Sequence, residues 1–404
     1  MEATLTWLDL TASDRDKMRR VLDLFKERGT LDEMGLGSLR DALSDALFPG
    51  TSYLQTRLRY ILFIPWIYRR LEGRLRDRSK VAEAARQREI GLVGALERSP
   101  ETDGIIGVVA RAALVRLPSS VYWSALTTWG IFQHQQSQGW YHSNFATLAG
   151  AEGVARADDP GVVWSRQPNW HPRLPDAPDS FPGEASFALT HGEADFLRGR
   201  FEERCSGTLL AWLARNGSDT PADSVWDDPD ALRAPNGIRC TVELARRFSL
   251  HVEGMPLLYN LLVAERRSDK LGSQETETID RFRAELAEWR VREGNEPPYE
   301  PDDLWQLLYR TGVRLRSPQR LFVERWGQRL AELGSGAVAA DGLLRSLIYN
   351  RELQLKGARA RLANVNRLLD WKPGVGVGRM DFRWVRVRRL LIDLHRGIGS
   401  DAVA

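Results

Sequence analysis

The sequence is poor in cysteine and has no long apolar run. Only Cys205 and Cys240 occur among 404 residues, which argues against a disulfide framework and indicates a reducing compartment. The longest apolar run, residues 60–68, is far shorter than the roughly 20 residues that a membrane span needs. Residues 1–7 lack the basic and then apolar pattern of a signal peptide. We therefore expect a cytoplasmic protein with no membrane partner.

Recognisable catalytic and cofactor motifs are also missing. None of the six histidines pairs with another at helical metal-ligand spacing, and no Cys-x-x-Cys or G-x-S-x-G motif occurs. The glycine-rich stretch 374–378 is not followed by the Lys-Ser/Thr of a phosphate loop, and the aspartates of 219–230 are typical of a solvated loop. The sequence thus predicts no catalytic residue, no metal site and no cofactor. An enzyme with an unfamiliar site is kept as the third hypothesis.

Charge is nearly balanced over the chain, at +3, but it is distributed unevenly. Residues 51–90 carry ten basic and four acidic side chains, and residues 344–396 carry thirteen and four. Residues 176–232 carry four basic and twelve acidic side chains. Two interpretations stay open: the basic segments bind a polyanion, or the acidic middle packs against them within the same fold.

Nearly all of the positive charge is arginine, because the chain has only six lysines. A GC-rich bacterial genome explains this usage, although the guanidinium fork also suits phosphate contacts. Arginines interleaved with aromatic residues on helices are typical of a surface that follows a phosphate backbone. The candidate DNA-binding residues are Arg57, Arg59, Arg69, Arg359, Arg361, Arg383, Arg386, Arg388 and Arg389.

Tryptophan is abundant, at 14 residues, and packing in the core is its usual role. Trp164 and Trp170 lie in a proline-rich stretch, where they are candidate anchors for a protein partner.

Apolar residues at helical spacing predict a mainly α, multi-helical protein with little β-structure. Helices are expected at 13–28, from Ser38 to Pro49, at 53–78 with a kink or a split at Pro65, at 81–98, 342–371 and 382–395, among others. Five prolines between residues 168 and 182 exclude a long regular element. We therefore expect two domains, an N-terminal helical domain at 1–150 and a C-terminal helical domain at 189–404 that ends in basic helices. An extended proline-rich connector, 151–188, would join them.

Several stretches resemble an uncharacterised bacterial family that is known only as a domain of unknown function. The most specific stretch is Phe-Pro-Gly-Thr-Ser at 48–52 with Gln-Thr-Arg-Leu-Arg-Tyr at 55–60 and Pro-Trp at 65–66. The others are Trp-Leu-Asp at 7–9, Pro-Ser-Ser-Val-Tyr-Trp at 118–123, Trp-His-Pro at 170–172, Arg-Glu at 351–352 and Asp-Phe-Arg-Trp at 381–384. The resemblance covers almost the whole chain.

The resemblance implies a role in anti-phage defence, because relatives of that family occur in defence gene clusters beside helicases and phospholipase D-like nucleases. It assigns no catalytic residue. The leading hypothesis is a non-enzymatic subunit of a bacterial defence system that binds DNA through its arginine-rich helices. The alternative is a scaffold or adaptor for a helicase or nuclease partner, in which the arginines meet acidic residues of that partner or of the protein's own middle.

Overall fold

The computed structural model of the protein is mainly α-helical, as the sequence predicts. It describes residues 32–75, 77–149, 155–156, 163–164, 168–272, 274–297, 301–311, 317–334 and 336–400. The helix expected at 13–28 lies outside these residues. No helix in this part of the chain combines the length and the apolar character that crossing a bilayer requires.

Two compact units share the chain, and neither is continuous in sequence. The first unit contains the residues up to Arg40 together with Arg247–Met380, and the second contains Asp41–Arg246 together with Asp381–Ala404. This division differs from the predicted one, which placed a connector at 151–188. The described proline-rich residues, 168–189, form a strap that packs inside the second unit. The aromatic side chains between its prolines are buried there and hold it in place. Phe181, for example, stacks on Phe63 with ring centroids 5.6 Å apart.

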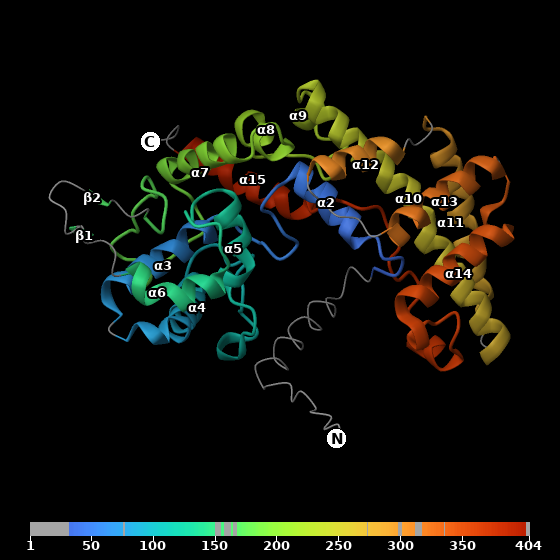
Figure 1. Cartoon of the computed structure of the whole chain (residues 1–404), viewed down its shortest axis with the longest axis horizontal. Helices are drawn as coiled ribbons and strands as arrows, with labels where there is room; N and C mark the ends of the chain where they lie inside the picture. The colour runs from blue at the N-terminus through green and yellow to red at the C-terminus, as the bar shows by residue number, and fades with distance from the viewer. Residues whose placement is uncertain are drawn as a thin grey trace, which may run out of the picture. The chain divides into compact units, whose positions relative to one another are not determined.

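Two groups of helices make up the second unit (Figure 1). One group packs α3 (Tyr60–Arg74), α4 (Val81–Glu97), α5 (Pro118–Thr128) and α6 (Gln138–Ala149), with 3₁₀ turns at Arg78–Lys80 and Arg111–Ala113. The other packs α7 (His191–Arg204), α8 (Leu209–Asn216) and α15 (Trp384–Gly399), with the short α9 (Pro229–Leu232) against α8. Strands β1 (Ala155–Arg156) and β2 (Val163–Trp164) form one small antiparallel sheet. Most of α2 (Gly37–Leu47) also belongs to this unit.

The first unit is built from long helices: most of α10 (Asn236–Leu271), then α11 (Thr276–Gly294), α12 (Pro301–Arg310), α13 (Ser317–Leu333) and α14 (Gly342–Lys356) (Figure 1). Short 3₁₀ turns lie at Val338–Ala340, Gly357–Arg359 and Val365–Asp370. Trp289 and Trp326 are fully buried between the helices, and they donate their indole N–H groups to the backbone oxygens of Leu250 and His251.

The predicted helix over 53–78 is wrong at its start, because α3 begins only at Tyr60. Side chains supply the hydrogen bonds that a helix would otherwise make within its own backbone. The amides of Thr56 and Arg57 donate to the hydroxyl of Tyr122, and the side-chain amide of Gln55 donates to the oxygen of Gly50. Pro65 lies within α3 and does not split it.

The predicted helix over 342–371 is also too long, because α14 ends at Lys356. Gly357 follows with φ of 54°, a left-handed conformation that glycine adopts readily. The carboxylate of Glu352 then accepts the amides of Arg361 and Leu362 at 3.1 and 2.9 Å, which holds the chain in its new direction. The last helix agrees with its prediction within four residues, since α15 spans Trp384–Gly399.

A buried carboxylate holds the start of α5. Glu89 of α4 is 1% exposed, and it accepts both the amide and the hydroxyl of Ser119 at 2.7 Å. An acidic group at a helix N-terminus satisfies a free amide and interacts favourably with the helix dipole. Burial nevertheless dominates and raises the pKa of Glu89 to about 7, against hydrogen bonds from Ser119 that lower it.

We predict that Glu89 makes stability depend on pH. The pKa of Glu89 is higher in the folded protein than the ordinary value of 4.5, so its stabilising contribution is full below pH 4.5 and is lost as the pH rises to about 7. Glu89→Gln, which cannot ionise, should therefore gain up to about 3 kcal/mol over the wild type as the pH rises through that window. Urea unfolding at several pH values measures the difference. Glu83→Gln, an exposed change on the same helix, is the control, and identical pH profiles for the two variants would refute the prediction.

Candidate functional site

The family-like segment 48–59 is a loop that other parts of the second unit hold in place. Thr51 donates its hydroxyl to the oxygen of Phe48, and the indole N–H of Trp129 donates to the oxygen of Pro49. Tyr53 donates its hydroxyl to Asp381 at 3.2 Å. The most specific part of the resemblance is therefore a structural junction, to which α5 and the residues before α15 contribute.

Arg57 is the centre of this junction, and only 2% of it is exposed. Its Nε donates to Asp393 Oδ2 at 2.9 Å, and its Nη2 donates to Glu101 Oε2 at 2.8 Å. Its Nη1 donates to the backbone oxygen of Asp103 at 3.1 Å, so every nitrogen of the guanidinium has a partner. The same Asp393 oxygen accepts the amide of Leu58 at 2.9 Å. Arg57 is therefore unavailable to a phosphate while the second unit is folded.

The carboxylates around Arg57 respond to burial and to charge in different proportions. Burial raises the pKa of Asp393, although the hydrogen bonds and the charge of Arg57 oppose the shift. Burial also acts to raise the pKa of Glu101, but its hydrogen bond and charge interaction with Arg57 prevail and lower it. Arg57 thus acts to lower the pKa of both carboxyl groups, and burial outweighs its effect only at Asp393.

Arg59 has a similar fixed environment and is 7% exposed. Its Nη2 donates to Glu193 Oε1 at 2.7 Å, and its Nη1 donates to the backbone oxygen of Ser186 at 3.0 Å. Glu193 also completes the capping box with Thr190 at the start of α7, a box that the sequence pattern predicts. Arg59 therefore links the loop before α3 to α7 and to the strap.

The basic face of the last helix is paired with acids of the same unit. Arg383 donates to Asp45 Oδ1 at 2.5 Å and to the oxygen of Thr51 at 2.8 Å, and Arg388 donates to Asp223 Oδ1 at 2.5 Å. Arg389 forms ion pairs with Glu101 and Asp103. Arg386 is exposed and donates its Nε to the backbone oxygen of Tyr53.

The remaining three candidate arginines differ in exposure. Arg69 is exposed and pairs with Asp176 at 3.1 Å. In the first unit, Arg361 pairs with Glu33 at 3.0 Å. Arg359 is exposed and has no ion-pair partner among the described residues. Neither Arg359 nor Arg361 lies on a long helix, contrary to the prediction, because α14 ends before them.

Seven of the nine candidate arginines thus have carboxylate partners, all but Arg359 and Arg386. Three of these partners lie within the acidic stretch 176–232: Asp176, Glu193 and Asp223. Of the two interpretations of the uneven charge, pairing within the fold accounts for these seven side chains.

Trp170, a candidate partner anchor, is 5% exposed and belongs to the core. Its indole N–H donates to Glu72, and its ring packs against those of Phe132 and Tyr141. It cannot anchor a partner without leaving this aromatic cluster. The backbone of Trp164 pairs in β2 with Ala155, and its side chain lies outside the described residues.

The first unit contains a buried cluster of carboxylates that sequence reasoning missed. Glu352 accepts the hydroxyl of Tyr259 at 2.7 Å and Lys356 Nζ at 3.0 Å, in addition to the two amides after α14. Glu33 pairs with both Lys356 and Arg361. Every carboxylate oxygen of the cluster accepts at least one donor from the chain, so the cluster joins segments of the first unit. The Arg-Glu pair at 351–352 is the only hint in the sequence.

Metal binding has no support in the described ranges, where no group of three or more His, Cys, Asp or Glu side chains is placed to hold an ion.

The chain belongs to a family of unknown function, DUF6361, whose sequence profile matches residues 2–397. Searches of curated proteins and of solved structures each gave no significant match. The prediction of an uncharacterised domain family is thus confirmed over nearly the whole chain, and the family carries no activity with it.

We predict that Arg57→Met destabilises the second unit by about 3–5 kcal/mol, because it leaves the buried Asp393 without the guanidinium that donates to it and with only the more distant Arg389, 3.9 Å away. Arg69→Met removes an arginine whose partner is exposed, and it should cost less than about 1 kcal/mol. Urea unfolding of the two variants measures both values. Equal costs would contradict the assignment of Arg57 as a buried structural residue.

Proposed function

We propose that this protein is an adaptor subunit that joins a helicase or nuclease partner into a multi-protein bacterial defence system. The observation that carries the proposal is the pairing of the family-like arginines. Arg57, Arg59 and Arg383 form ion pairs within the same unit, with Asp393, Glu193 and Asp45 respectively. Residues that build a rigid junction are expected in a protein that presents a surface to a partner. The helicase or nuclease identity of the partner rests on the resemblance to proteins of defence gene clusters.

Exposed apolar side chains of α14 offer a docking surface in the first unit. Leu343, Tyr349 and Leu353 of α14 are 62%, 37% and 40% exposed. Leu353 also lines a groove of about 500 Å³ together with Ala358, Ala363 and Val365. An exposed leucine at the edge of a groove is typical of protein interfaces.

The groove fits one kind of occupant, an amphipathic helix of the partner that carries a carboxylate. Apolar side chains at helical spacing would cover Leu353 and Val365, as in other helix-in-groove complexes. Arg359 follows the groove residue Ala358 directly, and it is exposed without an ion-pair partner among the described residues. A partner carboxylate at that end would neutralise it.

Co-purification with a recombinant bacterial helicase and a recombinant phospholipase D-like nuclease, the partner classes that the resemblance implies, tests this role. Leu353→Asp should weaken the complex by about 2 kcal/mol, roughly thirtyfold in Kd, because it places a charge in the apolar contact. Arg359→Glu should weaken it through like charge. Tyr309→Asp, at an 85% exposed side chain of α12, is the matched control and should leave binding unchanged.

Two results would contradict the adaptor role. One is the absence of a complex between the wild type and either candidate protein. The other is a complex that forms with unchanged affinity when Leu353 is replaced by aspartate.

A second candidate function is DNA binding by arginines other than the nine that the sequence singles out. It is favoured because the second unit also carries arginines that have no carboxylate partner among the described residues.

A further inference from the structure

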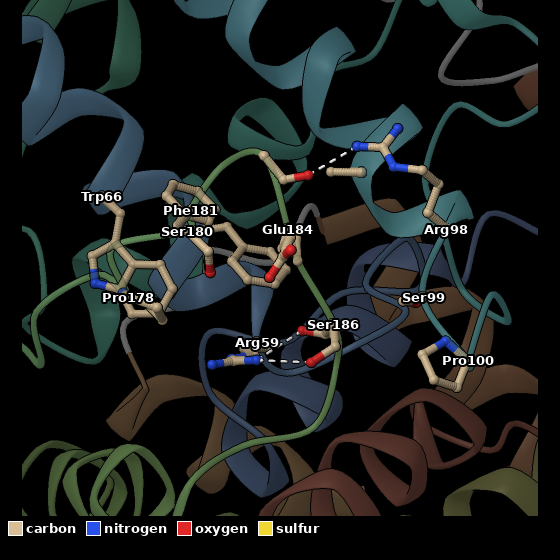
Figure 2. Close-up of a pocket in the computed structure, with 14 residues that line it drawn as sticks. Arg59, Trp66, Arg98, Ser99, Pro100, Pro178, Ser180, Phe181, Glu184 and Ser186 are labelled. Carbon is tan, nitrogen blue, oxygen red and sulfur yellow. Dashed lines mark hydrogen bonds between the residues drawn. The ribbon is translucent and has the colours of Figure 1, made fainter.

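An open cavity of about 490 Å³ lies in the second unit, between α3, the end of α4 and the strap (Figure 2). Phe63 and Trp66 of α3 form one side, and Ala95 and Arg98 contribute from α4 and the residue after it. Residues 178–186 of the strap form the rest of the wall. The hydroxyl-bearing residues Ser99, Ser180 and Ser186 also line it.

Arg59 lines this cavity, and its hydrogen bonds fix it in the wall. Its two terminal nitrogens bond to Glu193 and Ser186, the latter drawn as dashed lines in Figure 2. Its Nε is buried and has no hydrogen-bond partner among the described residues. Because this nitrogen is buried, it is not open to a ligand in the cavity.

Arg98 brings a full positive charge to the rim of the same cavity. Its guanidinium donates to the backbone oxygens of Gly94 and Gly183 at 2.7 and 2.8 Å, which fixes it against the strap. No carboxylate pairs with it in the described part of the chain. Figure 2 shows its guanidinium close to the strap, with one nitrogen turned away from the hydrogen bond that it makes there.

Three further arginines lie on the helices that flank the cavity, outside its wall. Arg70 and Arg74 follow Trp66 at intervals of four residues, so all three share one face of α3. Arg88 precedes Ala95 by seven residues, or two turns, and shares the cavity face of α4. We call Arg70, Arg74, Arg88 and Arg98 the arginine track.

Arg70 is close enough to Arg74 and Arg88 for their charges to repel. Burial lowers the pKa of Arg70, and the charges of Arg74 and Arg88 lower it further, while Asp179 acts in the opposite direction. Glu184 is the acidic residue in the cavity wall, and Asp176 is already paired with Arg69. The four arginines of the track have no ion-pair partner in the described residues. They therefore carry more positive charge than the nearby acidic groups can neutralise. Elsewhere in this unit, the arginines of the junction are neutralised by carboxylates.

We propose that the arginine track binds the phosphate groups of a nucleic-acid strand or a nucleotide. A guanidinium matches phosphate oxygens with paired N–H donors, and like charges held together without acids are stabilised by a polyanion. From Phe63 to Arg74 the helix rises about 17 Å, which is long enough to place more than one phosphate. Trp66 and Phe181 are buried, so their rings are not open for base stacking, and the contacts should be independent of base sequence.

Fluorescence anisotropy with labelled single- and double-stranded oligonucleotides of mixed sequence tests the proposal. The wild type should bind at about 50 mM salt and lose affinity steeply towards about 200 mM. The double variant Arg70→Gln/Arg88→Gln should bind more weakly and lower the slope of log affinity against log salt by about 2, because two phosphate contacts are lost. Arg69→Gln is the matched control, since Arg69 is adjacent on α3 but is paired with Asp176, and it should leave the slope unchanged.

Competition distinguishes the two sources of phosphate. Displacement of the oligonucleotide by a nucleoside triphosphate at equal phosphate concentration would assign the track to a free nucleotide, whereas displacement only by a longer strand would assign it to nucleic acid. No binding at about 50 mM salt would overturn the proposal. So would an unchanged salt slope in the double variant, once circular dichroism has shown that the variant is folded. The proposal is independent of the adaptor role, because the apolar groove of the first unit contributes no residue to the track.

Discussion

The buried ion pair between Arg57 and Asp393 connects residues that are 336 positions apart in the chain. Asp393 reaches both the guanidinium of Arg57 and the amide of Leu58, so one carboxylate on α15 fixes the loop that leads into α3. Removing a charge of this kind from water is costly unless its partners are complete. The loop, the last helix and Glu101 therefore depend on one another, which makes the second unit a single body despite its interrupted sequence.

Because arginines such as Arg57 are paired inside the fold, the arginine-rich composition does not by itself indicate a phosphate-binding surface. Clusters of arginine in a sequence suggest a phosphate-binding surface, but pairing across long distances in the chain neutralises most of the clusters in this protein. Arg388, for example, meets Asp223 of the acidic middle, and Arg383 meets Asp45 of α2. Arg70, Arg74 and Arg88 of α3 and α4 are among the arginines that have no ion-pair partner in the described residues, and they lie on the helices that flank a cavity.

The sequence predicts the elements well where local signals control them. The Thr-x-x-Glu pattern at 190–193 gives the start of α7, and Ser-Pro at 317–318 gives the start of α13. It fails where distant side chains replace helical hydrogen bonds, as Tyr122 does for the amides of Thr56 and Arg57. The burial of Trp170 and the pairing of Arg57 with Asp393 could not be predicted either, because both depend on contacts between segments far apart in the chain.

A double-mutant cycle between Arg57 and Asp393 tests most directly whether the family-like arginines are internal structural groups. The free energies of unfolding would be measured for Arg57→Met, for Asp393→Leu and for the double variant. The account predicts that the double variant is far more stable than the sum of the single losses implies, with a coupling of about 2–3 kcal/mol, because it removes both buried charges together. Losses that add to within about 0.5 kcal/mol would contradict the account, since independent residues behave in that way.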